Sequence, residues 1–308
     1  MIKNSSPELE TFLLSGGSKK STELLAQLGA AGVPFIEEGA ELKLAEEVDI
    51  LSPSVILEHA GEYCREEILE VYRSIGSTND AAIQQLAVSD EVVCVAETQL
   101  AGKGRRGRNW VSPFGCNIYL SIGRYLRCNI SELEGLSLVV GMAVVEVLRQ
   151  MGLEDIGVKW PNDLLLDGGK VGGILVEMRA PADDGVALVV GLGINLAMTE
   201  SEAVTIDQAW SQVGGRMRTS RSALVGDLIR QISAAVTKFE QVGFAAAAEI
   251  WPDYDIYMGE EVRIIRGDEI FVGIDQGVDE RGNLLLLNDG EVTAHNAGEV
   301  SLRPVRHR

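Results

Sequence analysis

The apolar residues in the middle of the chain follow two different spacings. At helical spacing they mark two long amphipathic segments: one begins at Ser131, with Glu134 placed for a capping box, and one runs from about Ser220 to Gln241. Shorter runs typical of buried strands lie at 92–96, 117–122, 156–160, 163–166, 173–178 and 186–192. Closely spaced strands with interspersed helices favour an α+β fold, with a central mixed or largely antiparallel sheet over residues 63–255.

The first 62 residues have a different texture, with shorter elements and an acidic end. The pattern predicts two short helices and then two small strands, at 9–13, 24–28, 33–36 and 41–44. Ser21 is placed to cap the second helix, and Gly29 and Gly32 are placed to end it. We therefore treat residues 1–62 as a unit of its own.

Residues 256–308 have an all-β pattern. Runs rich in β-branched and other apolar residues are separated by Arg-Gly-Asp, Arg-Gly-Asn and Asn-Asp-Gly turn signals, and they lie at 261–266, 269–274 and 284–287. Five short strands in about fifty residues predict a small barrel. The chain is thus expected to contain three units, at 1–62, 63–255 and 256–308.

Composition and charge narrow the class of protein. The chain has 308 residues, 46% of them hydrophobic, and a formal net charge of −19. No apolar run approaches the roughly 18–20 residues of a membrane span, and the N-terminus lacks a signal-peptide stretch. The net negative charge argues against a protein whose main function is to bind nucleic acid. The four cysteines show no metal spacing, so we expect free thiols, no metal ligands and a cytoplasmic protein.

The most informative stretch runs from Gln99 to Trp110. Within it, the seven residues from Gly102 to Arg108 alternate three glycines with four cations. Glycines let backbone N–H groups approach a ligand closely, and arginines bind carboxylates or phosphates through two parallel hydrogen bonds. Such a loop suits a substrate that carries both groups, as in the formation of an acyl-adenylate. Taken alone, the stretch is also compatible with an exposed basic loop or an RNA-binding patch.

A second stretch places polar residues around a turn. Asn162 and Asp163 follow a proline, where a turn is expected. Lys170 precedes a glycine pair and an apolar strand, so its ammonium group can lie over the face of the sheet. The alternative reading is a hairpin turn with an ordinary surface lysine.

Two further stretches contain polar side chains that could contact a ligand. Gly191 and Gly193 interrupt a strand, which suggests close approach by a ligand, and Asn195 is a polar residue between Ile and Leu. Asn195 could equally be a structural residue in a bulge. Ser77, Thr78 and Asn79 precede a helical pattern and are placed to cap it, which does not exclude contact with a ligand.

Taken in order, these stretches resemble the successive signatures of biotin protein ligases. The resemblance covers about residues 70–303. It implies a biotin/lipoate ligase-like catalytic domain followed by a small SH3-like β-barrel. It also implies an enzyme that uses ATP and Mg²⁺ to activate biotin as biotinyl-5′-AMP. The biotin is then transferred to a lysine of the biotin carboxyl carrier protein of acetyl-CoA carboxylase.

The resemblance assigns a role to each matching residue. It implies three catalytic residues: Arg105 retains the adenylate, Lys170 stabilises the α-phosphate, and Asp163 serves as a base or orienter for the incoming amine. Biotin contacts are implied for Ser77, Thr78, Asn79, Gln99, Gly102, Lys103, Gly104, Arg105, Lys170, Gly173 and Gly191. Contacts with ATP or the adenylate are implied for Arg105, Arg108, Trp110, Asn162, Lys170, Asn195 and Arg303. Glu299 and Arg303 would dock the C-terminal unit against the nucleotide.

The chain departs from the family pattern at two places. Lys103 stands where many members have arginine, which would weaken a contact that needs two parallel hydrogen bonds. The first 62 residues resemble a truncated winged helix without the recognition helix, and residues 1–60 hold ten acidic and four basic residues. We therefore expect no binding to operator DNA, and the resemblance is compatible with a homodimer. The alternatives are a bifunctional repressor, a lipoate or octanoyl ligase and, least favoured, a pure binding module.

Overall fold

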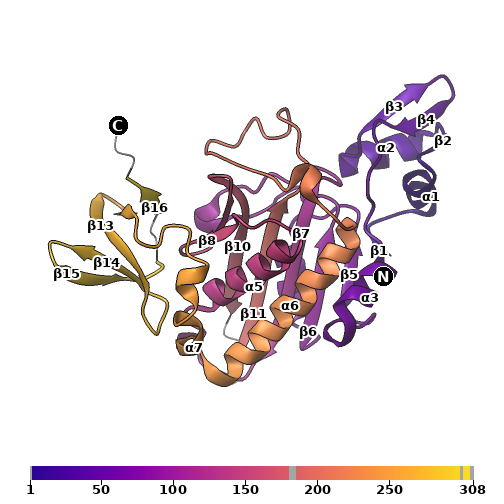
Figure 1. The fold of residues 1–308 in the computed structure, drawn as a ribbon. Helices are drawn as coiled ribbons and strands as arrows, with labels where there is room; N and C mark the ends of the chain where they lie inside the picture. Colours follow the sequence, from indigo (N-terminus) through magenta and orange to yellow (C-terminus); the bar gives the residue numbers. More distant parts are fainter. Residues whose placement is uncertain (1, 180–184, 299–300, 306–308) are drawn as a thin grey trace.

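A mixed eight-stranded sheet forms the centre of the computed structural model, which describes residues 2–179, 185–298 and 301–305 (Figure 1). Its strand order is β1-β5-β6-β7-β11-β10-β9-β8. The strands are β1 (Ile2–Lys3), β5 (Leu69–Tyr72), β6 (Glu91–Ala96), β7 (Asn117–Leu126), β8 (Gly157–Lys159), β9 (Asp163–Leu166), β10 (Gly169–Arg179) and β11 (Val186–Asn195). Strands β1, β5 and β6 run parallel, and every other neighbouring pair is antiparallel. The prediction of a mixed sheet with helices is confirmed.

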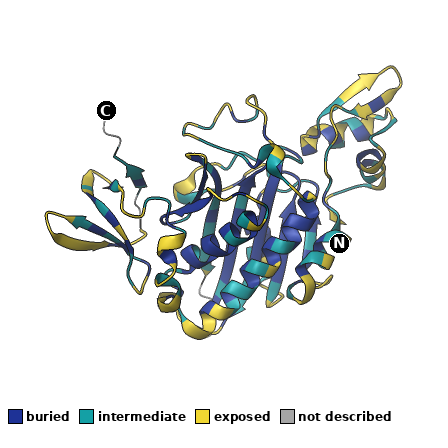
Figure 2. Cartoon of the chain, in the orientation of Figure 1, coloured by how far each residue is buried: buried dark blue, intermediate teal, exposed yellow. Residues whose placement is uncertain are grey.

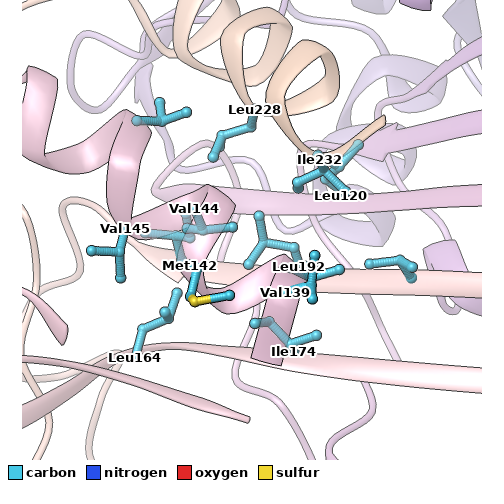
Figure 3. Close-up of a cluster of buried hydrophobic side chains, with 14 of the residues drawn as sticks. Leu120, Val139, Met142, Val144, Val145, Leu164, Ile174, Leu192, Leu228 and Ile232 are labelled. Atoms are coloured by element: carbon cyan, nitrogen blue, oxygen red, sulfur yellow. The ribbon is translucent and has the colours of Figure 1, made fainter. Parts of the chain in front are cut away.

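Helices α5 (Leu136–Gln150) and α6 (Arg221–Val242) cover one face of this sheet, and α3 (Pro53–Ala60) packs beside α6 (Figure 1). Successive residues of a strand point to opposite faces, so Leu192 turns toward these helices while its glycine neighbours turn away. Figure 3 shows Leu192 among Val139, Val144 and Leu228. Each large apolar side chain buried in this way contributes about 1.5–3 kcal/mol. Helix α4 packs on part of the other face, over β6, β7 and β11.

The start of α5 corrects a prediction. The capping box belongs to Asn129 and Glu132 in a short 3₁₀ turn (Ile130–Leu133), and α5 begins only at Leu136. Gly135 separates the two elements with a φ of 82°, and a Cβ there would lie 2.5 Å from the Phe244 ring. The expected capping box at Ser131 and Glu134 is therefore wrong, because a tertiary contact at Gly135 interrupts the helical pattern. By contrast, α6 begins where it was expected, and the Ser220 side chain caps it by accepting from the backbone N–H of Ala223.

The N-terminal segment has its own small core. Its elements are α1 (Pro7–Ser15), β2 (Gly17–Lys19), α2 (Thr22–Ala31), β3 (Phe35–Glu38) and β4 (Glu41–Leu44), and the strands form a sheet of order β2-β4-β3. The Ser21 hydroxyl accepts from the backbone N–H of Leu24 at 3.0 Å, which confirms the predicted cap. Strand β1 and helix α3 pack with the central sheet, although both precede residue 62. The proposed division of the chain stays a prediction.

The C-terminal segment is an antiparallel sheet of order β15-β14-β13-β12-β16. Its strands are β12 (Glu261–Arg266), β13 (Glu269–Val278), β14 (Leu284–Asn288), β15 (Glu291–His295) and β16 (Ser301–Pro304). Asp289 and Gly290 take φ values of 50° and 82°, as a tight Asn-Asp-Gly turn requires. The all-β pattern is confirmed, while the SH3-like closure stays a prediction.

Two short helices complete the fold, α4 (Thr78–Gln85) and α7 (Ala245–Ala248). Helix α4 contacts β6, β7 and β11, and Ala82, Cys94 and Val189 share a small core there. Buried residues are concentrated in the central sheet and on the sides of the helices that face it (Figure 2). Within the part of the chain described above, no helix combines the length and apolar character needed to cross a bilayer.

Candidate functional site

A cavity of about 140 Å³ lies on the side of the sheet that faces α4. Gly173, Gly191 and Gly193 of β10 and β11 line it. A Cβ at Gly191 would overlap the amide of Asn79, and one at Gly193 would lie 2.5 Å from the Trp110 ring. The expected close approach at these glycines is therefore made by side chains of the same chain, and only glycine leaves room for it.

At one end of the cavity, the start of α4 forms a polar cluster. Ser77 caps the helix, and the backbone N–H of Thr78 donates to Oε1 of Gln99 at 2.8 Å. The hydroxyl oxygen of Ser121 lies 2.8 Å from Oγ1 of Thr78 and 2.6 Å from Oδ1 of Asn79. These contacts fix the amide and hydroxyl groups in orientations from which they can meet a polar ligand. Ser121 was not predicted, although a polar residue between Leu120 and Ile122 in a strand-like run is a signal for it.

The amide of Asn79 has two further partners that the sequence did not indicate, the Leu175 carbonyl at 3.4 Å and the Glu177 carboxylate. Its Nδ2 donates to Oε2 of Glu177 at 2.8 Å. Glu177 lies on β10, so the helix and the sheet are joined by this hydrogen bond. The contact orients the Asn79 side chain over Gly191.

The glycine-rich loop folds back on itself as a tight hairpin. The backbone N–H of Trp110 donates to the carbonyl of Gly102 at 2.9 Å, and that of Gly104 to the carbonyl of Arg108 at 2.7 Å. A Cβ at Gly102 would lie 2.6 Å from the Trp110 carbonyl oxygen, so this glycine serves the packing of the loop. Lys103 forms an ion pair with Asp80 at 2.5 Å.

Arg105 joins three parts of the chain. Its Nη1 donates to Oδ1 of Asn162 at 2.8 Å, and its Nη2 donates to the carbonyls of Ala297 and Gly298, each at 2.6 Å. Burial lowers the pKa of Arg105, and the neighbouring Arg106 lowers it further. All these hydrogen-bond acceptors are uncharged, and a carboxylate or phosphate would make stronger bonds with the same guanidinium group.

Asp163 lies between two ammonium groups. Nζ of Lys170 is 2.5 Å from its Oδ1, and Nζ of Lys159 is 3.2 Å from its Oδ2. Burial alone would raise the pKa of Asp163, but the two cations outweigh it and hold that pKa below its ordinary value. Burial in turn lowers the pKa of Lys159. Lys159 was not among the predicted site residues, although it lies in one of the motifs.

The Trp110 ring lies over Gly173 and Gly193 of the sheet, beside Lys170. The Lys170 ammonium is 5.5 Å from the centre of its ring, within range of a cation–π interaction. Its indole Nε1 is buried and has no hydrogen-bond partner among the described residues. The ring thus covers Gly193 on the side where the resemblance places a nucleotide.

Most of the predicted site residues line this one cavity, namely Ser77, Thr78, Asn79, Gln99, Lys103, Gly104, Arg105, Arg108, Trp110, Asn162, Asp163, Lys170, Gly173, Gly191 and Arg303. Gly102 and Asn195 do not line it. The amide of Asn195 donates to the carbonyls of Lys170 and Ser211, at 3.4 and 3.1 Å, which is the structural alternative considered above. Glu299 lies outside the described residues.

Comparisons with known proteins agree with this arrangement. The model of the Biotin/lipoate A/B protein ligase family matches residues 70–195, and that of the Biotin protein ligase C terminal domain matches residues 257–303. The bifunctional ligase/repressor BirA of Escherichia coli strain K12 is 41% identical over 232 residues, which are 74% of this chain and 72% of that protein. The biotin--[acetyl-CoA-carboxylase] ligase of Mycobacterium tuberculosis is 31% identical over 240 residues, 75% of this chain and 88% of the relative.

A solved structure extends the similarity to the fold. The biotin protein ligase from Aquifex aeolicus in complex with biotin and ATP is 28% identical, with a TM-score of 0.63 over 77% of this chain and 99% of that one. Fold and site therefore define a ligase of the biotin/lipoate type. The chain belongs to the biotin protein ligase family, which confirms the resemblance found in the sequence.

Proposed function

We propose that this chain joins biotin to ATP, forming biotinyl-5′-AMP and pyrophosphate, and then transfers the biotinyl group to a lysine of the carrier domain of acetyl-CoA carboxylase. The Mycobacterium relative is named for the second reaction, and the Aquifex structure contains both small substrates. One observation carries the proposal. A single cavity joins the polar cluster at Thr78 to the cations Arg105 and Lys170 across a floor of glycines.

The polar end of the cavity suits the ring of biotin. A ureido group has two N–H donors and one carbonyl acceptor. The hydroxyl of Thr78 and the amides of Asn79 and Gln99 offer both acceptors for the N–H groups and donors for the carbonyl. Their hydrogen bonds to one another and to Ser121 fix their orientations before the ligand arrives. Gly191 lets the Asn79 amide lie close against the sheet, and Gly173 does the same for Lys170 and Trp110, which places these side chains around the slot for the rings.

The cationic end suits the reacting groups. The carboxylate of biotin must approach the α-phosphate of ATP, and two unit charges 4 Å apart repel by about 4 kcal/mol at an effective dielectric constant near 20. Lys170 and Arg105 would neutralise this repulsion and stabilise the charge that builds in the transition state. Arg108, Trp110 and Arg303 would contact the nucleotide.

Asp163 would position Lys170 rather than accept a proton. A carboxylate whose pKa is held below its ordinary value is a weak base at neutral pH, and both of its oxygens already have cationic partners. The lysine amine of the carrier, in its neutral form, would attack the carbonyl carbon of the mixed anhydride. The bond between the carbonyl carbon and the phosphate oxygen then breaks, AMP leaves, and the nitrogen loses one proton to solvent as the amide forms.

Magnesium would enter with ATP. Among the described residues that line the cavity, Asp163 is the one carboxylate, and it is engaged by Lys159 and Lys170. No group of three or more His, Cys, Asp or Glu that could hold an ion is found in the described ranges. Mg²⁺ commonly binds through substrate phosphates and keeps several waters. The residues of the cavity therefore fit a Mg²⁺ ion that arrives bound to the triphosphate of ATP and supplies positive charge there.

The N-terminal segment would not bind operator DNA. The Escherichia relative is named as a repressor as well as a ligase. Here α2 leads directly into the β3–β4 hairpin, and residues 1–60 carry a net charge of −6, from ten acidic and four basic residues. A helix that reads the major groove needs length and cations or amides. A gel-shift assay with the cell's own biotin-operon promoter, biotin and ATP tests this, and a specific shift at ordinary salt would overturn it.

The ligase activity is tested by mass spectrometry of the carrier. The chain is incubated with ATP, Mg²⁺, biotin and the carrier domain, and the carrier is expected to gain one biotinyl group. A parallel reaction with lipoate in place of biotin is expected to leave the carrier unmodified. A lipoyl adduct, or no adduct at all, contradicts the proposal.

A further inference from the structure

The C-terminal sheet is apolar on both sides. Its core side holds buried residues such as Ile264, Leu286 and Leu302. Cross-strand partners share a face of the sheet, so the register also defines the opposite side, which we call the outer face. It carries Ile265, Ile270, Val272, Ile274, Leu285, Leu287, Val292 and Ala294.

The outer face is open to solvent. Ile270 is 61% exposed, Val272 40% and Val292 53%. An antiparallel sheet normally presents polar residues to water, and contiguous exposed apolar patches mark interaction sites. This face of the sheet therefore has the composition of a docking surface.

The outer face begins at the wall of the cavity. Two rows of cross-strand partners pass from β16 through β12 to β13: one runs from Ser301 through Ile265 to Ile270, and the other from Arg303 through Arg263 to Val272. Ser301 and Arg303 line the cavity. Neighbouring strands lie about 4.8 Å apart, so the exposed side chains of β13 are roughly 10 Å from the cavity wall.

The charges on this face point to an acidic partner. Arg263 is exposed beside Arg303, and neither has an ion pair among the described residues. Glu261 is the carboxylate on the same face, opposite Ile274 and away from the cavity. In a chain of net charge −19, two arginines that have no ion pair with any described residue and lie next to apolar residues favour carboxylates on the molecule that binds. Interface cores are enriched in arginine and apolar side chains in the same way.

We propose that the outer face docks the carrier domain during the second half-reaction, through an apolar patch of the carrier rimmed by carboxylates. This inference rests on the proposed function. Only the second half-reaction needs a protein, and its lysine must reach the cavity at whose wall this face begins. A second copy of the chain bound at the same place would obstruct that approach.

The test compares two matched substitutions of exposed valines. Val272→Asp places a charge on the outer face, whereas Val88→Asp does so after α4 at a residue that is 84% exposed. Adenylate formation is followed as pyrophosphate release with biotin, ATP and Mg²⁺ in the absence of carrier. Transfer of the biotinyl group is followed at increasing concentrations of carrier domain. In a separate reaction, hydroxylamine replaces the carrier domain as a small acceptor of the biotinyl group.

For Val272→Asp, the carrier concentration that gives half the maximal rate is expected to rise at least about tenfold, because a charge enters the apolar centre of the interface. Pyrophosphate release and the hydroxylamine reaction should stay within about twofold of the unmodified chain, and Val88→Asp should match it throughout. Arg263→Glu should also raise the carrier concentration needed. Equal carrier dependence for Val272→Asp and Val88→Asp would overturn the proposal.

Two other outcomes also decide the matter. If Val272→Asp abolishes self-association in sedimentation and leaves the carrier dependence unchanged, the occupant of the outer face is a second copy of the chain. If the unmodified chain releases no pyrophosphate, the proposed function fails, and the assignment of the carrier fails with it.

Discussion

Asp275 is expected to make the stability of the protein fall as pH rises, and replacing it should remove that dependence. Asp275 is fully buried on β13, and its Oδ2 has no hydrogen-bond partner among the described residues. Burial, with repulsion from the buried Asp255, raises the pKa of Asp275 from 3.8 to about 8. Burial likewise raises the pKa of Asp255 to about 6.

The sign and size follow from the two states. The unfolded chain loses this proton near pH 4, whereas the folded chain keeps it until about pH 8. The free energy of unfolding is therefore at its full value below pH 4, where the Asp275 carboxyl is protonated in both states. It falls as pH rises toward 8. The free energy of unfolding should fall by up to about 1.4 kcal/mol per pH unit in this window, or roughly 4 kcal/mol between pH 5 and pH 8, as an upper bound.

The measurement is urea unfolding of the unmodified chain and of Asp275→Asn at pH 5 to 9. The variant is expected to be more stable at pH 8 by an amount that shrinks steadily toward pH 5. Asp279→Asn is the control, because hydrogen bonds from Asn283 and Arg281 lower the pKa of Asp279 despite the opposing effect of burial. A stability difference between Asp275→Asn and the unmodified chain that stays constant with pH would refute the reasoning.

Three further substitutions test the site and its support. Lys170→Met removes the cation nearest Asp163 and should slow pyrophosphate release by about 10²-fold or more, and a loss below tenfold would argue against its role at the α-phosphate. Gly191→Ala pushes a methyl group into the Asn79 amide and should weaken biotin binding by about tenfold in calorimetry while ATP binding is unchanged; equal weakening of both would be inconsistent with the assigned slot. Glu97→Ala leaves the buried guanidinium group of Arg221 without a carboxylate and Arg73 with Glu10 alone, and should cost about 3–5 kcal/mol in urea unfolding; a cost under about 1 kcal/mol would show that the network is dispensable.

Local patterns in the sequence predicted much of the fold. Residues 220–241 were expected as a helix, and α6 spans 221–242, because its apolar stripe and its Ser220 cap agree. The strand at 163–166 was placed at its observed limits. The four stretches were read separately, and most of the residues singled out in them line one cavity.

Features that depend on distant partners were not predictable. Glu97 is buried by arginines at positions 73 and 221, and a contact across 124 residues leaves no local pattern. The late start of α5 depends on the packing of Phe244 against Gly135. The hydrogen bonds of Asn195 to two backbone carbonyls likewise have no signature in the sequence, and its contact with the nucleotide stays a prediction.

The central claim is that the cavity brings the carboxylate of biotin and the α-phosphate of ATP together beneath Arg105 and Lys170. Its most direct test is to incubate the purified chain with biotin, ATP and Mg²⁺ in the absence of carrier and to measure the products. The account predicts biotinyl-5′-AMP and one pyrophosphate for each adenylate formed, and neither product at a comparable rate from Lys170→Met. Pyrophosphate release without the adenylate, or no reaction by the unmodified chain, would contradict it.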